Sequence, residues 1–217
     1  NCSESCNEYE LIFVLNHLGE VEIQLARYQQ AQERFDLCLE MLQKGNVNDS
    51  LLYSEIYKHQ AVLRCHHGKP KEALANINKC IDIQIEAYGG NGMENVETLL
   101  LRGQIYLDLC KVKEATEDIE TSIQITQKYY GDKHNYYIKA YNSLAYLYRI
   151  LNNFAKSRAF YLQALSLGLE LYGKNHVEVA ETYMGHGFVY QFDGEMEKAI
   201  EALETAYEAH VNIVGEN

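Results

Sequence analysis

Apolar residues recur along this chain at helical spacing, in blocks separated by short polar breaks. One block shows the pattern i, i+3, i+4, i+7 at Tyr141, Leu144, Ala145 and Tyr148. This spacing places the four side chains on one face of a helix. The pair Asn152–Asn153 then signals a turn, and a second helical stripe follows from Phe154 to Gly173. The block therefore predicts a hairpin of two helices.

The same pattern returns every 42 residues. Small residues occupy one position of the period at Gly19, Ala61, Gly103, Ala145 and Gly187. They occupy another, 12 residues later, at Ala31, Ala73, Ala115, Ser157 and Ala199. Large residues that we expect to fill the space between hairpins follow at Phe35, Ile77, Ile119, Tyr161 and Leu203. A period of this length is typical of stacked helical hairpins, whose helices approach closely where both lack bulk.

The breaks between helices share the period. Turns within hairpins are predicted at Ala26–Arg27, Gly68–Lys69, Cys110–Lys111, Asn152–Asn153 and Gly194–Glu195. Second helices are predicted to end at Tyr88–Gly89, Tyr130–Gly131, Tyr172–Gly173 and Val214–Gly215. We therefore expect one array over residues 1–217, with repeats at about 8–45, 51–89, 93–131, 135–173 and 177–215. The predicted fold is all-α, a right-handed α-solenoid of five hairpins with about ten antiparallel helices. No polar capping helix follows the fifth hairpin, so we expect a segment of a longer protein or an array capped by a partner.

The residues at the repeat positions resemble the tetratricopeptide repeat (TPR). The resemblance rests on Leu18, Gly19, Ala31 and Phe35 in the first repeat and on Gly187, Tyr190, Gly194 and Ala199 in the fifth. The spacers Tyr130-Gly-Asp-Lys-His134 and Tyr172-Gly-Lys-Asn-His176 resemble those of the kinesin light chain type, which has 42-residue repeats. This resemblance covers nearly the whole chain and implies a protein-interaction scaffold with a concave surface lined by the first helix of each hairpin.

Composition narrows the classes of partner. The net charge is −12, which argues against nucleic acid and anionic membranes, because both attract basic surfaces. No apolar run is long enough to span a bilayer. Two of the six cysteines, Cys38 and Cys80, stand at repeat positions that take Ser or Ala elsewhere, and Cys110 falls in a turn. We expect these to be free thiols in a reducing compartment, the cytoplasm, with a cytoskeletal or ciliary association as an alternative.

No catalytic or metal-binding pattern stands out. The adjacent His66 and His67 point about 100° apart on a helix and are interpreted as turn residues. Cys2 and Cys6 share a helix face, but two ligands do not make a zinc site. No Ser/His/Asp, Cys/His or paired-carboxylate set is evident. We predict no enzyme activity, no cofactor and no metal.

The resemblance assigns groove positions to the first helices. In the fourth repeat these are the basic and polar residues Lys139, Asn142, Tyr146 and Arg149, with Lys156 and Arg158 nearby on the second helix. This spot is predicted to contact an acidic or C-terminal peptide; the alternative is a solvated face with a buried tyrosine. The third and fifth repeats offer apolar and acidic groove candidates, namely Leu107, Asp108, Glu181, Met184 and Phe188. Alternatively, Phe188 and Phe192 belong to the core or to a joint with a further repeat.

The sequence is compatible with three functions. The leading one is a scaffold or adaptor that presents a concave peptide- or partner-binding surface within a larger complex. The second is a regulatory or sensor domain attached to an enzyme or a transcription factor. The third is a motor cargo adaptor of kinesin light chain type, or a ciliary or cytoskeletal assembly element. Each implies a protein or peptide partner, without nucleic acid or membrane insertion.

Overall fold

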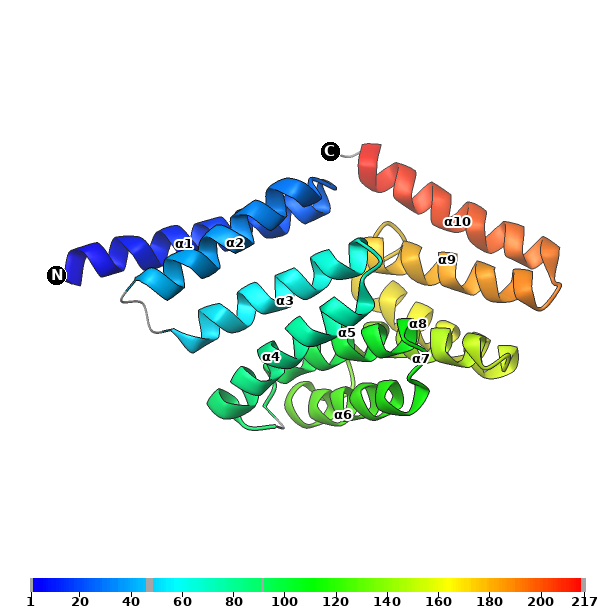
Figure 1. Ribbon diagram of the computed structural model, residues 1–217. Helices are drawn as coiled ribbons and strands as arrows, with labels where there is room; N and C mark the ends of the chain where they lie inside the picture. The colour runs from blue at the N-terminus through cyan, green and yellow to red at the C-terminus, as the bar shows by residue number, and fades with distance from the viewer. Residues whose placement is uncertain (1, 46–48, 91, 216–217) are drawn as a thin grey trace. The chain divides into compact units, whose positions relative to one another are not determined.

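The computed structural model describes residues 2–45, 49–90 and 92–215, and all of their side chains except those of residues 2–7 and 214. Within these residues it contains ten helices and no strand, which confirms the all-α prediction (Figure 1). The chain divides into two compact units, Asn1–Lys111 and Val112–Asn217. The single array over residues 1–217 stays a prediction.

The helices follow the predicted hairpin plan. The first unit contains α1 (Cys2–Gln24), α2 (Tyr28–Lys44), α3 (Ser50–His66), α4 (Pro70–Tyr88) and α5 (Asn95–Asp108). The second unit contains α6 (Val112–Tyr130), α7 (Asn135–Ile150), α8 (Phe154–Tyr172), α9 (Val177–Phe192) and α10 (Met196–Gly215). In each unit successive helices pack together, and each first helix also packs on the hairpin before it, as α3 does on α1 and α9 does on α7.

The turns within hairpins share one backbone geometry. Left-handed residues recur every 42 positions, at Ala26, Gly68, Cys110, Asn152 and Gly194, with φ between +55° and +83°. After each of them, the next N–H donates to a carbonyl five residues earlier, as Arg27 N–H does to Glu22 O at 2.8 Å. This is the Schellman end of a helix, which satisfies carbonyls that the helix leaves open. The predicted turns are therefore confirmed.

The spacer between hairpins has a capping function. Gly131 and Gly173 end α6 and α8 with positive φ. The next helices then begin at histidines: His134 Nδ1 accepts from Tyr136 N–H, and His176 Nδ1 accepts from Glu178 N–H, both at 3.3 Å. Tyr130 stacks on His134 and Tyr172 on His176, with ring centroids 4.0 and 3.9 Å apart. The Tyr-Gly-x-x-His spacing thus places a ring stack behind each histidine cap.

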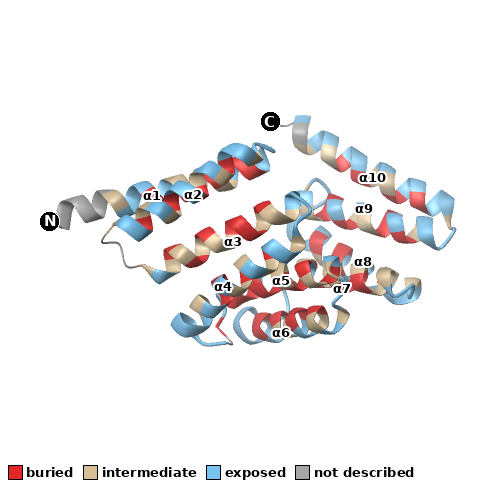
Figure 2. Ribbon diagram, in the orientation of Figure 1, coloured by how far each residue is buried: buried red, intermediate tan, exposed pale blue. Residues whose placement is uncertain are grey.

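Small residues set how closely the helices of a hairpin approach. All ten small-residue positions of the repeat are buried (Figure 2). At Gly19 an added Cβ would stand 2.6 Å from Phe35 Cε1, and at Gly187 it would stand 2.8 Å from Leu203 Cγ. The large residue of the second helix therefore packs directly onto the backbone of the first helix, so a side chain at Gly19 or Gly187 would have to displace it.

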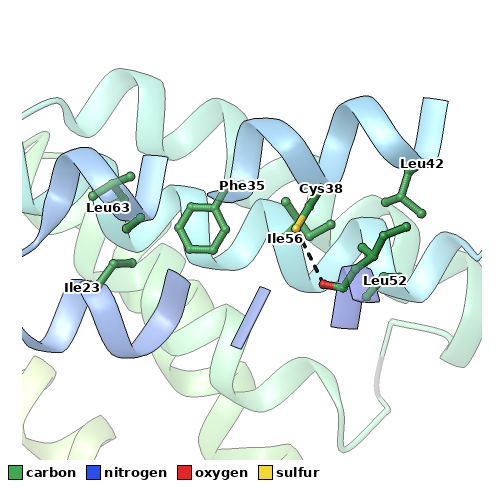
Figure 3. Packing of buried hydrophobic residues seen from close by; sticks show 9 residues of the cluster. Ile23, Phe35, Cys38, Leu42, Leu52, Ile56 and Leu63 are labelled. Atoms are coloured by element: carbon green, nitrogen blue, oxygen red, sulfur yellow. Dashed lines mark hydrogen bonds between the residues drawn. The ribbon is translucent and has the colours of Figure 1, made fainter. Parts of the chain in front are cut away.

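The core of the first unit shows how the cysteines are used. Phe35, Cys38 and Leu42 of α2 pack against Leu52, Ile56 and Leu63 of α3 and Ile23 of α1 (Figure 3). The Cys38 thiol donates to the Ile12 carbonyl at 3.6 Å, and burial raises the pKa of Cys38 to about 11. Cys80 is likewise fully buried. Both are unpaired thiols that fill space in the core, as predicted.

We predict that Gly19→Ala lowers the free energy of unfolding by about 1–3 kcal/mol, because the new methyl group overlaps the Phe35 ring. The second repeat carries the compatible pair Ala61 and Ile77 at the same two positions. The double variant Gly19→Ala/Phe35→Ile should therefore lose less unfolding free energy than the sum of the losses in the two single variants. Urea denaturation of the four proteins of this cycle measures the coupling; strictly additive effects would contradict the packing explanation.

The shared turn geometry predicts stability changes of opposite sign. Gly194→Ala places a Cβ at φ +83° and should destabilise the fold by about 1 kcal/mol. Ala26→Gly relieves the same strain at φ +55° and should stabilise it by up to about 1 kcal/mol. Thermal and urea unfolding of both variants check the signs. A loss of stability in Ala26→Gly would show that chain entropy outweighs strain at this turn.

Candidate partner-binding site

The predicted groove residues of the second unit lie on α7 and α9. Lys139, Asn142, Tyr146 and Arg149 follow the spacing i, i+3, i+7, i+10 on α7, so they share one face, and all four are half-buried. On α9, Glu181, Met184 and Phe188 follow the spacing i, i+3, i+7 and are exposed. Phe192, one turn beyond Phe188, exposes 61% of its surface.

The polar residues of α7 join it to α9. Lys139 Nζ lies 3.5 Å from Glu178 Oε1, and Asn142 Nδ2 donates to Thr182 Oγ1 at 2.8 Å. Because the Thr182 hydroxyl itself donates to the Glu178 carbonyl at 2.7 Å, its oxygen is the acceptor for Asn142. This arrangement fixes the orientation of the Asn142 amide. Its Oδ1 is buried and has no hydrogen-bond partner among the described residues.

The cations predicted as a basic spot all have intramolecular partners. The Arg149 guanidinium carbon lies 4.7 Å from the Tyr146 ring centroid and 5.1 Å from that of Phe192. Lys156 Nζ lies 4.9 Å above the Tyr148 ring. Arg158 pairs with Asp193 and, at 3.1 Å, with Glu195. The spot is therefore less positive than its sequence suggests, and an incoming carboxylate competes with contacts already made.

The face of α9 is apolar with one carboxylate. Met184, Phe188 and Phe192 stand one helical turn apart and expose 39%, 40% and 61% of their surfaces. Because successive turns align, these side chains form a row, which we call the α9 ridge. Glu181 lies beside this ridge. Partial desolvation of its carboxyl group by the neighbouring side chains, followed by the charge of Glu178, raises the pKa of Glu181. The alternative that Phe188 and Phe192 are core residues does not hold within the second unit as described.

In the first unit the prediction that Leu107 lines the groove is wrong. Leu107 is 2% exposed and, like Leu100, belongs to the core rather than to a surface. The run Leu99–Leu101 puts aliphatic residues on most of the circumference of α5, so the pattern could not distinguish groove from core. Asp108 is exposed, and partial burial raises the pKa of its carboxyl group. Burial and the charge of Asp108 raise the pKa of Cys65 to about 11.

A polar cavity of about 210 Å³ lies between α3, α4 and α5 of the first unit. The ion pair between Lys58 Nζ and Glu97 Oε2, at 3.1 Å, forms part of its wall. Gln84 Oε1 also lines it and is buried without a hydrogen bond to any described residue. Since the lysine is already paired, this cavity is a weaker candidate than the α9 ridge.

The described residues contain neither a cluster of metal ligands nor a membrane-spanning helix. No three His, Cys, Asp or Glu side chains among them gather as metal ligands would. His66 stacks on Tyr28 at 5.3 Å and His67 meets the same ring edge-on at 5.6 Å. The side chains of Cys2 and Cys6 lie outside the described residues. None of the described helices has the length and hydrophobicity needed to cross a bilayer.

The sequence matches the tetratricopeptide repeat family over residues 10–86, 94–168 and 138–210. The chain belongs to this family. A comparison with curated protein sequences finds no match.

Solved structures share the fold at low sequence identity. BtubC (BKLC) from P. vanneervenii is 18% identical with a TM-score of 0.72, over 95% of this chain and 82% of that one. A Podospora anserina protein with nearly identical TPR-like repeats, described as of kinesin light chain type, is 16% identical with a TM-score of 0.65, over 93% and 95%. The Rap conjugation gene regulator of plasmid pLS20, solved with the Phr* peptide, is 14% identical with a TM-score of 0.79, over 96% and 55%. These likenesses establish the fold.

Two buried histidines are expected to make stability depend on pH. Burial, with Lys58 nearby, lowers the pKa of His59 to about 4, and burial, with Arg158 nearby, lowers the pKa of His186 to about 4. In the unfolded chain a histidine titrates near pH ~6.5, so as the pH falls the unfolded state takes up these protons first. Stability should therefore be full above about pH 6.5 and fall until about pH 4, by up to about 3 kcal/mol for each histidine.

Urea denaturation between pH 7 and pH 4 measures this loss. His186→Leu introduces the residue found at the equivalent position, Leu144, and removes one of the two protonation sites. The free energy of unfolding of this variant should fall less steeply over the same pH range. An unchanged pH dependence would show that His186 is not one of the groups responsible.

Proposed function

We propose that this chain is a protein-interaction scaffold that holds a peptide segment of a partner protein against α7 and α9. The observation that carries this proposal is the α9 ridge of Met184, Phe188 and Phe192, which leaves three large apolar side chains in water. Burial of such side chains by a partner is favourable, and clusters of them mark interaction sites.

The neighbouring charges define the peptide that fits best. The Arg149 guanidinium carbon lies 4.7 Å from the Tyr146 ring centroid and 5.1 Å from that of Phe192, and the guanidinium N–H groups can donate to a carboxylate. Lys139 is paired with Glu178 but keeps 40% of its side chain exposed. A peptide with apolar residues for the ridge and an acidic or C-terminal carboxylate for Arg149 meets both requirements.

Two further observations support the scaffold proposal. The Rap regulator, whose structure holds the Phr* peptide, shows that a fold of this kind can bind a peptide. The cysteines whose side chains are described, Cys38, Cys65, Cys80 and Cys110, are unpaired. Unpaired thiols are typical of a reducing compartment, so the proposed place of action is the cytoplasm, within a larger assembly.

The test is site-specific photo-crosslinking in cells that contain the native partners. A photoreactive phenylalanine replaces Phe188 in one protein and Tyr129, an aromatic residue of similar exposure on α6, in a matched control. We expect one defined partner to crosslink at position 188 and not at position 129. Phe192→Ser should then lower the amount of that product about tenfold or more, because apolar anchors dominate binding free energy.

A second experiment tests whether Arg149 binds the carboxylate of the peptide. Arg149→Gln should weaken binding of the identified peptide and leave unchanged the affinity for a version with its carboxylate amidated. Equal crosslinking at positions 188 and 129, or no loss in Phe192→Ser, would contradict the proposed site.

A further inference from the structure

The spacer between α4 and α5 departs from the pattern of the spacers that follow α6 and α8. Those two spacers place a histidine four residues after a tyrosine, and the rings of Tyr130 and Tyr172 stack on these histidines. The spacer after α4 has Tyr88 and, four residues later, Gly92. The Tyr88 ring stacks on no ring and no cation of the described residues. It therefore keeps a face that the histidine covers in the other two spacers.

The loss of the histidine also changes how the next helix begins. α5 begins at Asn95, two repeat positions later than α7 and α9 begin, and no side chain caps it. A Cβ added at Gly92 would lie 2.9 Å from Glu94 Oε2 and 3.1 Å from Tyr88 Cβ. The Glu94 carboxylate therefore lies next to the point from which a histidine side chain would start.

The polar cavity between α3, α4 and α5 adjoins this spacer, because Tyr88 and Glu94 both line it. All of its lining residues belong to the first unit. Its volume is about 210 Å³, and a cavity of about 150 Å³ is enough to hold a molecule the size of benzene. The cavity can therefore admit a small organic group.

Two buried oxygen atoms in the cavity wall have unused hydrogen-bonding capacity. Gln84 Oε1 and Thr98 Oγ1 make no hydrogen bond with any described residue, and Thr98 is only 1% exposed. Burial raises the pKa of the nearby Cys80 thiol, and the hydroxyls of Ser54 and Thr98 oppose that rise. A weak contact of this kind still leaves a lone pair of Thr98 Oγ1 unused. Because unpaired buried acceptors cost free energy, a ligand that donates to them gains affinity.

The charges around the cavity favour a cation. Lys58 is paired with Glu97, whereas the lining residues Glu55 and Glu94 make no ion pair with any described residue. Burial lowers the pKa of Lys58, but the charge and hydrogen bond of Glu97, together with the charge of Glu55, outweigh burial and raise it. The wall therefore carries two more carboxylates than cations, which disfavours an anion and attracts a positive group.

A guanidinium group matches this wall better than other common cations do. It is planar, it stacks on aromatic rings, and it has five N–H donors for several acceptors at once. An ammonium group has three donors and no planar face. A metal ion is disfavoured, because no three His, Cys, Asp or Glu side chains of the described residues gather as ligands.

We propose that this cavity binds a guanidinium group, carried either by an arginine side chain of a partner protein or by a free guanidino compound. The group stacks on Tyr88, as the spacer histidines stack on their tyrosines, and pairs with Glu94. Its remaining N–H groups donate to the buried oxygens of Gln84 and Thr98. The site belongs to the first unit and does not depend on the α9 ridge.

The probe is N-acetyl-L-arginine methylamide, and isothermal titration calorimetry of the full chain gives its affinity. The citrulline analogue has the same shape but a neutral urea group, and it should bind about tenfold or more weakly, because charge-assisted hydrogen bonds are lost. The lysine analogue should bind about threefold or more weakly, because it cannot stack. Free L-arginine distinguishes the two sources: tighter binding of the capped probe indicates a protein side chain, and tighter binding of the free amino acid indicates a small compound.

Variants of the spacer test the position of the site. Glu94→Gln should weaken binding of the arginine probe about fivefold or more, because it removes a charged acceptor. The matched control Glu86→Gln changes the net charge equally at an exposed residue on the opposite side of α4, and it should bind as the wild type does. Gly92→His restores the histidine of the other spacers, so it should cover Tyr88 and abolish binding. Thermal unfolding without the probe checks that each variant is folded.

Three results would overturn the proposal. Absence of binding at millimolar concentrations of the arginine probe would show that the cavity holds water only. Equal affinity for the arginine and citrulline probes would show that charge plays no part. Equal losses in Glu94→Gln and Glu86→Gln would show attraction to the acidic chain as a whole. Each is distinguishable from failure of the proposed function, because crosslinking at Phe188 in the second unit should persist in the spacer variants.

Discussion

The close approach of the two helices in the hairpins α1–α2, α3–α4, α7–α8 and α9–α10 is the constraint on which the rest of each unit depends. In the first hairpin the Phe35 ring lies against the backbone at Gly19, and in the fifth Leu203 lies against Gly187. Because protein interiors are close-packed, a single methyl group there changes the spacing of the hairpin. That spacing sets where the next first helix packs, and therefore which side chains stay exposed for a partner.

The contacts between successive hairpins also build the candidate partner-binding site. Lys139 with Glu178, Asn142 with Thr182 and Arg149 with Phe192 join α7 to α9. These polar and aromatic contacts hold the α9 ridge beside Arg149, so the side chains that position the site also hold the helices together. Preorganisation of this kind lowers the conformational entropy that the protein itself must lose when a peptide binds.

The sequence predicted the candidate site in part. It located the face, because residues three, four and seven apart share one side of a helix. It did not show that the cations of the fourth repeat are already partnered, since Glu178 and Asp193 come from the next hairpin and lie 39 and 35 residues from Lys139 and Arg158. Leu107 was misassigned for a related reason. An aliphatic residue looks the same in the sequence whether a neighbouring helix covers it or leaves it in water.

By itself the sequence determined the helices, their turns and the small residues between them, because these depend on local geometry that repeats every 42 residues. A left-handed residue ends each first helix whether it is Gly68, Asn152 or Cys110. Tertiary structure alone decided which of the equivalent faces are covered. Leu165 and Tyr207 occupy the same position in the repeat, yet one is buried and the other exposed. The difference arises because burial depends on the neighbouring helix, and the repeat position does not specify that neighbour.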